Sequence, residues 1–286
     1  MAPGHKTGQP GLDWEAYVHG LVAEHGSLAA VAAKLSAARA FAEDAGSVER
    51  GLRRLRGRGH HDGGVWGQRA LAVFGLSAAA QDRVRWMGHY HSRFTDLPTS
   101  VCAELLATWN RPPVSESKTR VWVYLGLASV ALRRRERSLA TAHLTQARLA
   151  LTAAPAAAQA EYALVAAYAA GRDSNEQVVE CLHAASTALA ASDIDAVDHA
   201  CLVARKIDQE AYLLNKPRSG APDHEAALAL YERIPADGPP FARCRRETGL
   251  GWTRLRLGQR AELSRTAARA CPWRATPGRC GCARWA

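Results

Sequence analysis

The chain has 286 residues, of which 48% are hydrophobic and 22% charged, and it carries a formal net charge of +10. This length and composition allow one or two domains with a sizeable core and exclude a compositionally disordered chain. Only four Phe and seven Tyr occur beside abundant Ala, Leu and Arg, so the composition favours an all-α fold.

Cysteine usage and hydropathy bear on the compartment. The seven cysteines have no regular spacing, and the opening segment MAPGHKTGQPG does not resemble a signal peptide. No apolar run approaches the roughly 20 residues that a bilayer crossing needs. We therefore expect reduced thiols, a cytoplasmic location and no membrane partner.

The first part of the chain has the pattern of a small helical domain. Residues 1–11 are rich in helix breakers and are expected to form a disordered leader, and residues 12–111 follow as the N-terminal domain. Asp13 and Ser27 are predicted N-caps, and Gly26 is a predicted helix end. Further helices are predicted to begin at Ser47, at Ser77 and at Pro98, before a boundary at Pro112-Pro113.

The helix predicted from Ser47 to Arg56 has two different faces. Val48, Leu52 and Leu55 recur at helical spacing and form an apolar stripe. The other face and the turn after it hold the densest charge cluster of the chain, which is the candidate DNA-binding set: Arg50, Arg53, Arg54, Arg56 and Arg58.

The helix predicted over residues 28–35 and this basic helix together resemble a helix-turn-helix. The Gly-rich string GHHDGGVWG follows where a winged variant would have its wing. The connection over residues 36–46 is longer than the usual turn of this family. The resemblance implies that the arginines contact DNA bases and phosphates. The alternative is that they form an ordinary solvent-exposed face of an Arg-rich protein.

Residues 114–271 read as a succession of helix pairs with a unit of about 40 residues. Small residues such as Gly126 and Gly249 recur where two helices would cross closely. The predicted first helices cover residues 115–133, 154–171, 193–214 and 240–257; the predicted second helices cover residues 137–151, 174–191, 222–234 and 259–271. Such hairpins stack into a superhelix with a concave surface.

The first and last of these units resemble the tetratricopeptide repeat. Leu250-Gly251, Gly258, Ala267 and Ala270 match its Leu-Gly, Gly, Ala and Ala positions in order and spacing. Leu125-Gly126 is similarly followed by Ala140, Leu144 and Ala147, with a longer turn. The resemblance implies a tetratricopeptide-like array that binds a protein or peptide partner on its concave surface.

The motifs of enzymes and of metal sites are not found. No nucleophile elbow, phosphate-binding loop, His-Glu-x-x-His or Cys-x-x-Cys pattern occurs, so we expect no enzyme, no catalytic residue, no cofactor and no metal. The histidines of His60-His61 and His89-Tyr90-His91 lack a partner pair at a metal-ligand spacing. Residues 272–286 are an irregular tail rich in Cys, Trp and Pro, and we hypothesise that a frameshift produced it.

The sequence thus predicts a non-enzymatic regulator with a DNA-binding N-terminal segment and a partner-binding repeat array. An oligomer is compatible with this prediction. The alternative is a tetratricopeptide-like scaffold for protein partners that has no role with nucleic acid.

Overall fold

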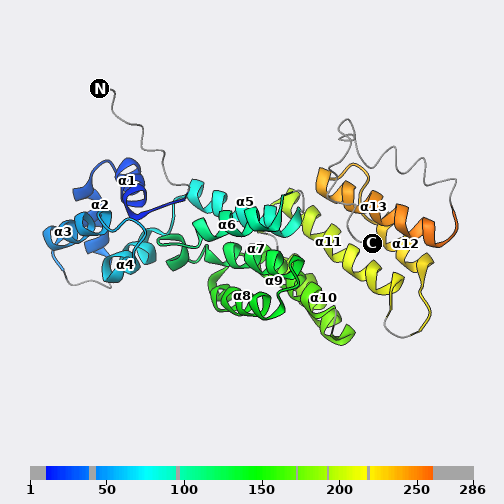
Figure 1. The fold of residues 1–286 in the computed structure, drawn as a ribbon. Coiled ribbons are helices and arrows are strands. Elements are labelled where there is room, and N and C mark those ends of the chain that lie inside the picture. Colours follow the sequence, from blue (N-terminus) through cyan, green and yellow to red (C-terminus); the bar gives the residue numbers. More distant parts are fainter. Residues whose placement is uncertain are drawn as a thin grey trace, which may run out of the picture. The chain divides into compact units, whose positions relative to one another are not determined.

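The computed structural model describes residues 11–38, 43–94, 97–171, 173–191, 193–217 and 220–259 (Figure 1). Within these ranges the regular structure is helical and no strand occurs, which confirms the predicted all-α class. The leader before residue 11, the predicted helix over 259–271 from residue 260 onward, and the tail lie outside them. No described helix is long and apolar enough to cross a membrane.

The helix bounds lie within about three residues of the predicted ones, except for the start of the first repeat helix. The first predicted repeat helix begins at Arg120 instead of residue 115, because residues 114–116 form the short 3-10 helix η1. The α-helices are α1 (Trp14–His25), α2 (Leu28–Ala37), α3 (Ala45–Arg56), α4 (Gly64–Phe74), α5 (Ala78–Arg93), α6 (Thr99–Trp109), α7 (Arg120–Arg133), α8 (Arg137–Ala150), α9 (Ala156–Ala170), α10 (Asn175–Leu189), α11 (Ala196–Asn215), α12 (His224–Glu232) and α13 (Pro240–Arg256); a second 3-10 helix, η2, covers Leu151–Ala153.

The chain divides into two compact units. Unit 1 comprises residues 1–93, 98–130 and 145–153, and unit 2 comprises residues 94–97, 131–144 and 154–286. Helices α1–α6 therefore belong to unit 1 and α9–α13 to unit 2, whereas α7 and α8 each contribute residues to both.

Capping side chains define the start of unit 1. The Asp13 carboxylate accepts a hydrogen bond from the Ala16 N–H at 2.8 Å, and the Ser27 hydroxyl accepts one from the Ala30 N–H at 3.1 Å. Gly26 ends α1 with a φ of 89°, a backbone conformation that favours glycine. The predicted caps of the first two helices are confirmed.

The core at the start of unit 1 forms where α1, α2 and α3 pack on one another (Figure 1). Trp14 from α1, Leu35 from α2 and Leu52 from α3 are all fully buried. Each such apolar side chain contributes about 1.5–3 kcal/mol when it leaves water. The apolar stripes predicted from the sequence therefore meet in one small core.

Close helix crossings in the rest of unit 1 depend on glycine. A Cβ added at Gly88 of α5 would lie 2.3 Å from the Trp122 carbonyl oxygen, and one at Gly126 of α7 would lie 2.9 Å from Leu106. These distances are shorter than van der Waals contact, so a larger residue would push the helices apart. The close crossing predicted at Gly126 is confirmed.

Unit 2 has the connectivity of consecutive helical hairpins. Helices α9 and α10 form one closely packed pair, and α11 and α12 form the next. Helix α11 also packs against α9 before it and α13 after it. The arrangement is compatible with a helical repeat, as the spacing of the sequence predicts.

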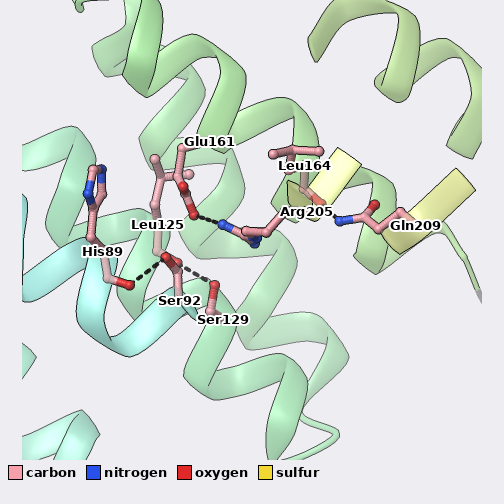
Figure 2. A network of polar contacts seen from close by, with 8 residues as sticks. All are labelled: His89, Ser92, Leu125, Ser129, Glu161, Leu164, Arg205 and Gln209. Atoms are coloured by element: carbon pink, nitrogen blue, oxygen red, sulfur yellow. Dashed lines mark hydrogen bonds and ion pairs between the residues drawn. The ribbon is translucent and has the colours of Figure 1, made fainter. Parts of the chain in front are cut away.

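A buried ion pair joins two of these hairpins. The Arg205 guanidinium of α11 donates to the Glu161 carboxylate of α9, and Figure 2 shows the two side chains pointing toward each other. Glu161 is fully buried and Arg205 is 8% exposed. One helical turn further along α11, the Gln209 side-chain amide donates to the Leu164 carbonyl at 3.0 Å. These contacts fix the register of α11 against α9.

A second polar cluster ties α11 to α12 and α13. The Tyr231 hydroxyl donates to the Asp208 carboxylate at 2.9 Å, and Arg245 donates to the other carboxylate oxygen at 2.8 Å. Burial and the neighbouring Asp208 charge raise the pKa of Tyr231 well above its usual range. A Cβ at Gly249 would lie 2.1 Å from the Tyr231 ring, which confirms the close crossing predicted there.

Candidate nucleic-acid interface

The basic helix α3 is attached to unit 1 by the stripe that the sequence predicts. Val48, Leu52 and Leu55 are at most 1% exposed and face α1 and α2. The helix begins at Ala45, two residues before the predicted cap Ser47. Asp44 is the N-cap instead, because its carboxylate accepts from both the N–H and the hydroxyl of Ser47, at 2.9 and 2.8 Å.

The connection between α2 and α3 is shorter than the sequence pattern suggested. It covers residues 38–44, since α2 continues to Ala37 and α3 starts at Ala45. The Ser36 hydroxyl donates to the Glu43 carbonyl at 2.8 Å, and Arg69 of α4 contacts the Glu43 carboxylate at 2.6 Å. The hydrogen bond from Arg69 lowers the pKa of Glu43. The end of the connection is therefore held in place by two other elements.

Helix α4 packs against α3 through an aromatic ring that lies on a glycine. A Cβ added at Gly51 would lie 2.3 Å from the Trp66 ring, so only glycine permits this approach. The Arg69 guanidinium lies 5.2 Å from the centre of the Trp66 ring on the same helix. The packing fixes α3 on the side next to its apolar stripe.

The Gly-rich segment after α3 does not form the strands of a wing. Residues 57–60 form a turn, and α4 begins at Gly64, so the later part of GHHDGGVWG is helical. The physical reason is the buried ring of Trp14. Its indole N–H donates to the His61 carbonyl at 2.8 Å, and Cβ atoms at Gly63 and Gly67 would come within 2.3 and 2.8 Å of it.

The structure exposes all five candidate arginines: Arg50, Arg53, Arg54, Arg56 and Arg58. The first four lie on α3, and Arg58 lies in the turn that follows. Arg58 donates to the Asp62 carbonyl, and Arg50 donates to the Ser47 hydroxyl at 2.9 Å. In the described part of the chain, the side chains of Arg54 and Arg56 form no hydrogen bond or ion pair.

The electrostatics of this face are strongly positive. Glu49 is the one acidic residue among residues 45–58, and its carboxylate pairs with Arg53 at 2.6 Å. The Arg53 side chain is nevertheless 65% exposed, so its pairing with Glu49 is largely screened by water. The face can therefore donate hydrogen bonds to anionic groups, and the C-terminal dipole of α3 also favours its cations.

Glu116 supports the turn from the other side. Its carboxylate accepts from the Gly63 N–H at 3.0 Å, and the ring of His60 contacts the Pro112 carbonyl at 3.2 Å. Burial, which outweighs the Gly63 hydrogen bond, raises the pKa of the Glu116 carboxyl above its ordinary value of 4.5. The folded state therefore holds a proton at Glu116 more strongly than the unfolded chain.

We expect the Glu116→Gln variant to be more stable than the wild type at neutral pH and to lose this advantage in acid. A carboxyl whose pKa is higher in the folded state than in the unfolded state stabilises the fold at pH values below its unfolded-state pKa. That contribution is lost as the pH rises through the folded-state pKa. Glutamine keeps an oxygen acceptor for Gly63 and does not ionise. Urea unfolding of both proteins between pH 4 and pH 7 measures the difference, and an advantage that grew in acid would contradict the assignment.

A groove is the second surface feature of interest, and it lies in unit 2. Helices α10, α11 and α12 line an open groove with a volume of about 450 Å³. The sequence pattern did not reveal this groove, although its lining residues on α10 and those on α11 each recur at helical spacing. Helix α10 contributes Val179, Leu182, His183 and Ser186, α11 contributes Lys206, Glu210, Leu213 and Leu214, α12 contributes Leu230, and Arg233 follows the end of α12.

No family model, no curated protein and no solved structure matches the chain. Among the residues with described positions, no group of three or more His, Cys, Asp or Glu side chains could hold a metal ion. Cys102 and Cys201 are buried, whereas Cys181 is half-buried.

Proposed function

We propose that this protein is a non-enzymatic regulator that binds DNA through α3 and a protein or peptide partner through the hairpins of unit 2. In this proposal α3 is the recognition helix of a helix-turn-helix, and residues 114–271 are a tetratricopeptide-like array. Its place of action is the cytoplasm. The observation that carries the DNA half is the exposed arginine face on a helix whose opposite face is buried.

Three features support the DNA half. The apolar stripe and Gly51 attach α3 to unit 1, so the arginines project from a rigid element. Arg54 and Arg56 lie on the exposed side of α3, where their guanidinium groups can reach phosphates or guanine edges. Helices α2 and α3 pack together across the connection over residues 38–44, in the order that a helix-turn-helix has.

The packing of the helical hairpins supports the proposed binding of a partner by unit 2. Helix α11 packs against both α9 and α13, so successive first helices are neighbours, as in a stacked array. The groove in unit 2 offers a concave surface lined by both apolar and polar side chains, of the size that ligands and peptide side chains occupy.

Replacing Arg50 and Arg54 by alanine tests the DNA half. The double variant should bind random-sequence duplex DNA at least about tenfold more weakly, since each lost phosphate contact weakens binding. Fluorescence anisotropy of a labelled duplex with the full chain gives the affinity, and circular dichroism checks that the helical content is unchanged.

Arg148 and Arg243 provide the matched control, because both are exposed arginines outside α3. The Arg148→Ala, Arg243→Ala double variant removes the same charge and should retain most of the affinity. Equal affinities of the wild type and the Arg50→Ala, Arg54→Ala variant would refute the recognition helix. No binding by any of these proteins would favour the scaffold, a protein that binds partners and no DNA.

A further inference from the structure

We propose that the groove of unit 2 binds an amphipathic α-helix of a partner protein that carries acidic residues beside its apolar stripe. This inference rests on the partner-binding half of the proposed function, to which it adds a place and a chemistry. The groove lies between α10 and α12, with α11 between them in the chain and against both in space.

The groove leaves apolar side chains accessible to solvent. Val179 of α10 is 57% exposed, and Leu213 and Leu230 are half-buried beside the fully packed part of α11 and α12. Their apolar atoms would leave water when a partner side chain enters, with a gain of roughly 25 cal/mol per Å². The volume of about 450 Å³ admits several side chains of a partner but not a folded domain.

The spacing of the lining residues suits a helix. Positions 179, 182, 183 and 186 on α10 recur at i, i+3, i+4 and i+7, and so extend over about 10 Å at 1.5 Å per residue. Two turns of a partner helix have the same length. A helix in such a groove inserts its own i, i+3, i+4 and i+7 side chains, which is a recurring mode of peptide recognition.

The charged side chains around the groove favour a partner helix with negative charge. Lys206 and Glu210 neutralise each other through a 2.6 Å contact between Nζ and Oε1. Arg233 is exposed at the rim and, within the described ranges, forms no ion pair. The groove therefore has one uncompensated cation, so a carboxylate beside the apolar stripe of the partner is favoured. The net charge of +10 also steers acidic partners toward the protein.

The test uses a labelled, Ala-rich helical peptide of about 16 residues, with leucines at i, i+3, i+4 and i+7 and flanking glutamates. Fluorescence anisotropy with the full chain should show saturable binding. The Val179→Glu variant should bind it at least about tenfold more weakly, because a carboxylate would be buried against leucine. The Arg233→Glu variant should bind it about fivefold more weakly and should prefer the same peptide with lysines in place of the glutamates.

Val197 and Arg243 supply the matched controls. Val197 is also 57% exposed and lies on α11 outside the groove, so Val197→Glu should leave the affinity unchanged. Arg243→Glu removes an exposed cation from α13 and should likewise have little effect. No saturable binding of the glutamate peptide, or equal affinity of Val179→Glu and Val197→Glu, would overturn the proposal.

Other occupants have distinct outcomes. Analytical ultracentrifugation that finds a dimer in the wild type and a monomer in Val179→Glu would assign the groove to a second copy, against the proposal. Peptide binding that appears only after deletion of residues 260–286 would assign it to that segment, also against it. Peptide binding that persists in Val179→Glu, with hydrogen-exchange protection outside α10 and α12, would show that the groove is not the binding site. The proposal of this groove would then be wrong, whereas the proposed partner-binding function would not be contradicted.

Discussion

Replacement of Glu161 by alanine is expected to destabilise unit 2 by about 3–5 kcal/mol, the usual cost of removing one partner from a buried ion pair. Glu161 is fully buried and its carboxylate accepts from Arg205. Alanine removes this negative charge while the Arg205 guanidinium stays buried, and it leaves a cavity between α9 and α11. Urea unfolding, with hydrogen exchange of the α9 and α11 amides as the local readout, measures the loss.

An exposed ion pair and a double variant serve as controls for Glu161. Arg137 and Asp173 form a 3.1 Å pair whose side chains are both 60% exposed, so Asp173→Ala should cost at most about 1 kcal/mol. The Glu161→Leu, Arg205→Met variant replaces both charges by apolar groups and should recover most of the stability. A loss below about 1 kcal/mol in Glu161→Ala would show that water compensates the pair.

Replacement of Trp14 by alanine is expected to destabilise unit 1 by about 3–5 kcal/mol. The Trp14 ring is fully buried, lies against Gly63 and Gly67, and donates to the His61 carbonyl at 2.8 Å. Its removal opens a cavity beneath the turn that follows α3. We therefore expect the DNA affinity to fall as well, because the arginine face loses its rigid support.

Thermal unfolding followed by circular dichroism measures the effect of Trp14→Ala. Trp86 is the matched control, since its side chain is 59% exposed and Trp86→Ala should change the midpoint little. A midpoint for Trp14→Ala equal to that of Trp86→Ala would contradict the described packing. Unchanged DNA affinity in a destabilised Trp14→Ala protein would show that α3 needs no support from this turn.

Local features of the fold could be predicted from the sequence. Asp13 and Ser27 precede apolar stripes and cap α1 and α2, and Ser77 accepts from the Ala80 N–H at 3.3 Å at the start of α5. Caps and stripes depend on residues within a few positions of one another. The exposure of the arginines on α3 follows from the same rule, since their position opposite the buried stripe is a matter of helical spacing.

Long-range contacts could not be predicted in this way. The pairing of Glu161 with Arg205 and the packing of Trp66 on Gly51 join residues on different helices, and no local pattern specifies which helices meet. The predicted start of α3 was wrong by two residues. Asp44 and Ser47 are both good capping residues, and the hydrogen bond between them makes Asp44 the cap. The groove was missed because its stripes belong to separate helices.

The dependence of DNA affinity on salt tests the central claim most directly. If four or five arginines of the α3 face contact phosphates, the slope of log K against log salt concentration should be about −4 for the full chain on duplex DNA. The Arg50→Ala, Arg54→Ala variant should reduce its magnitude by about 2. A slope near zero, or a steep slope that this variant leaves unchanged, would contradict DNA binding by α3.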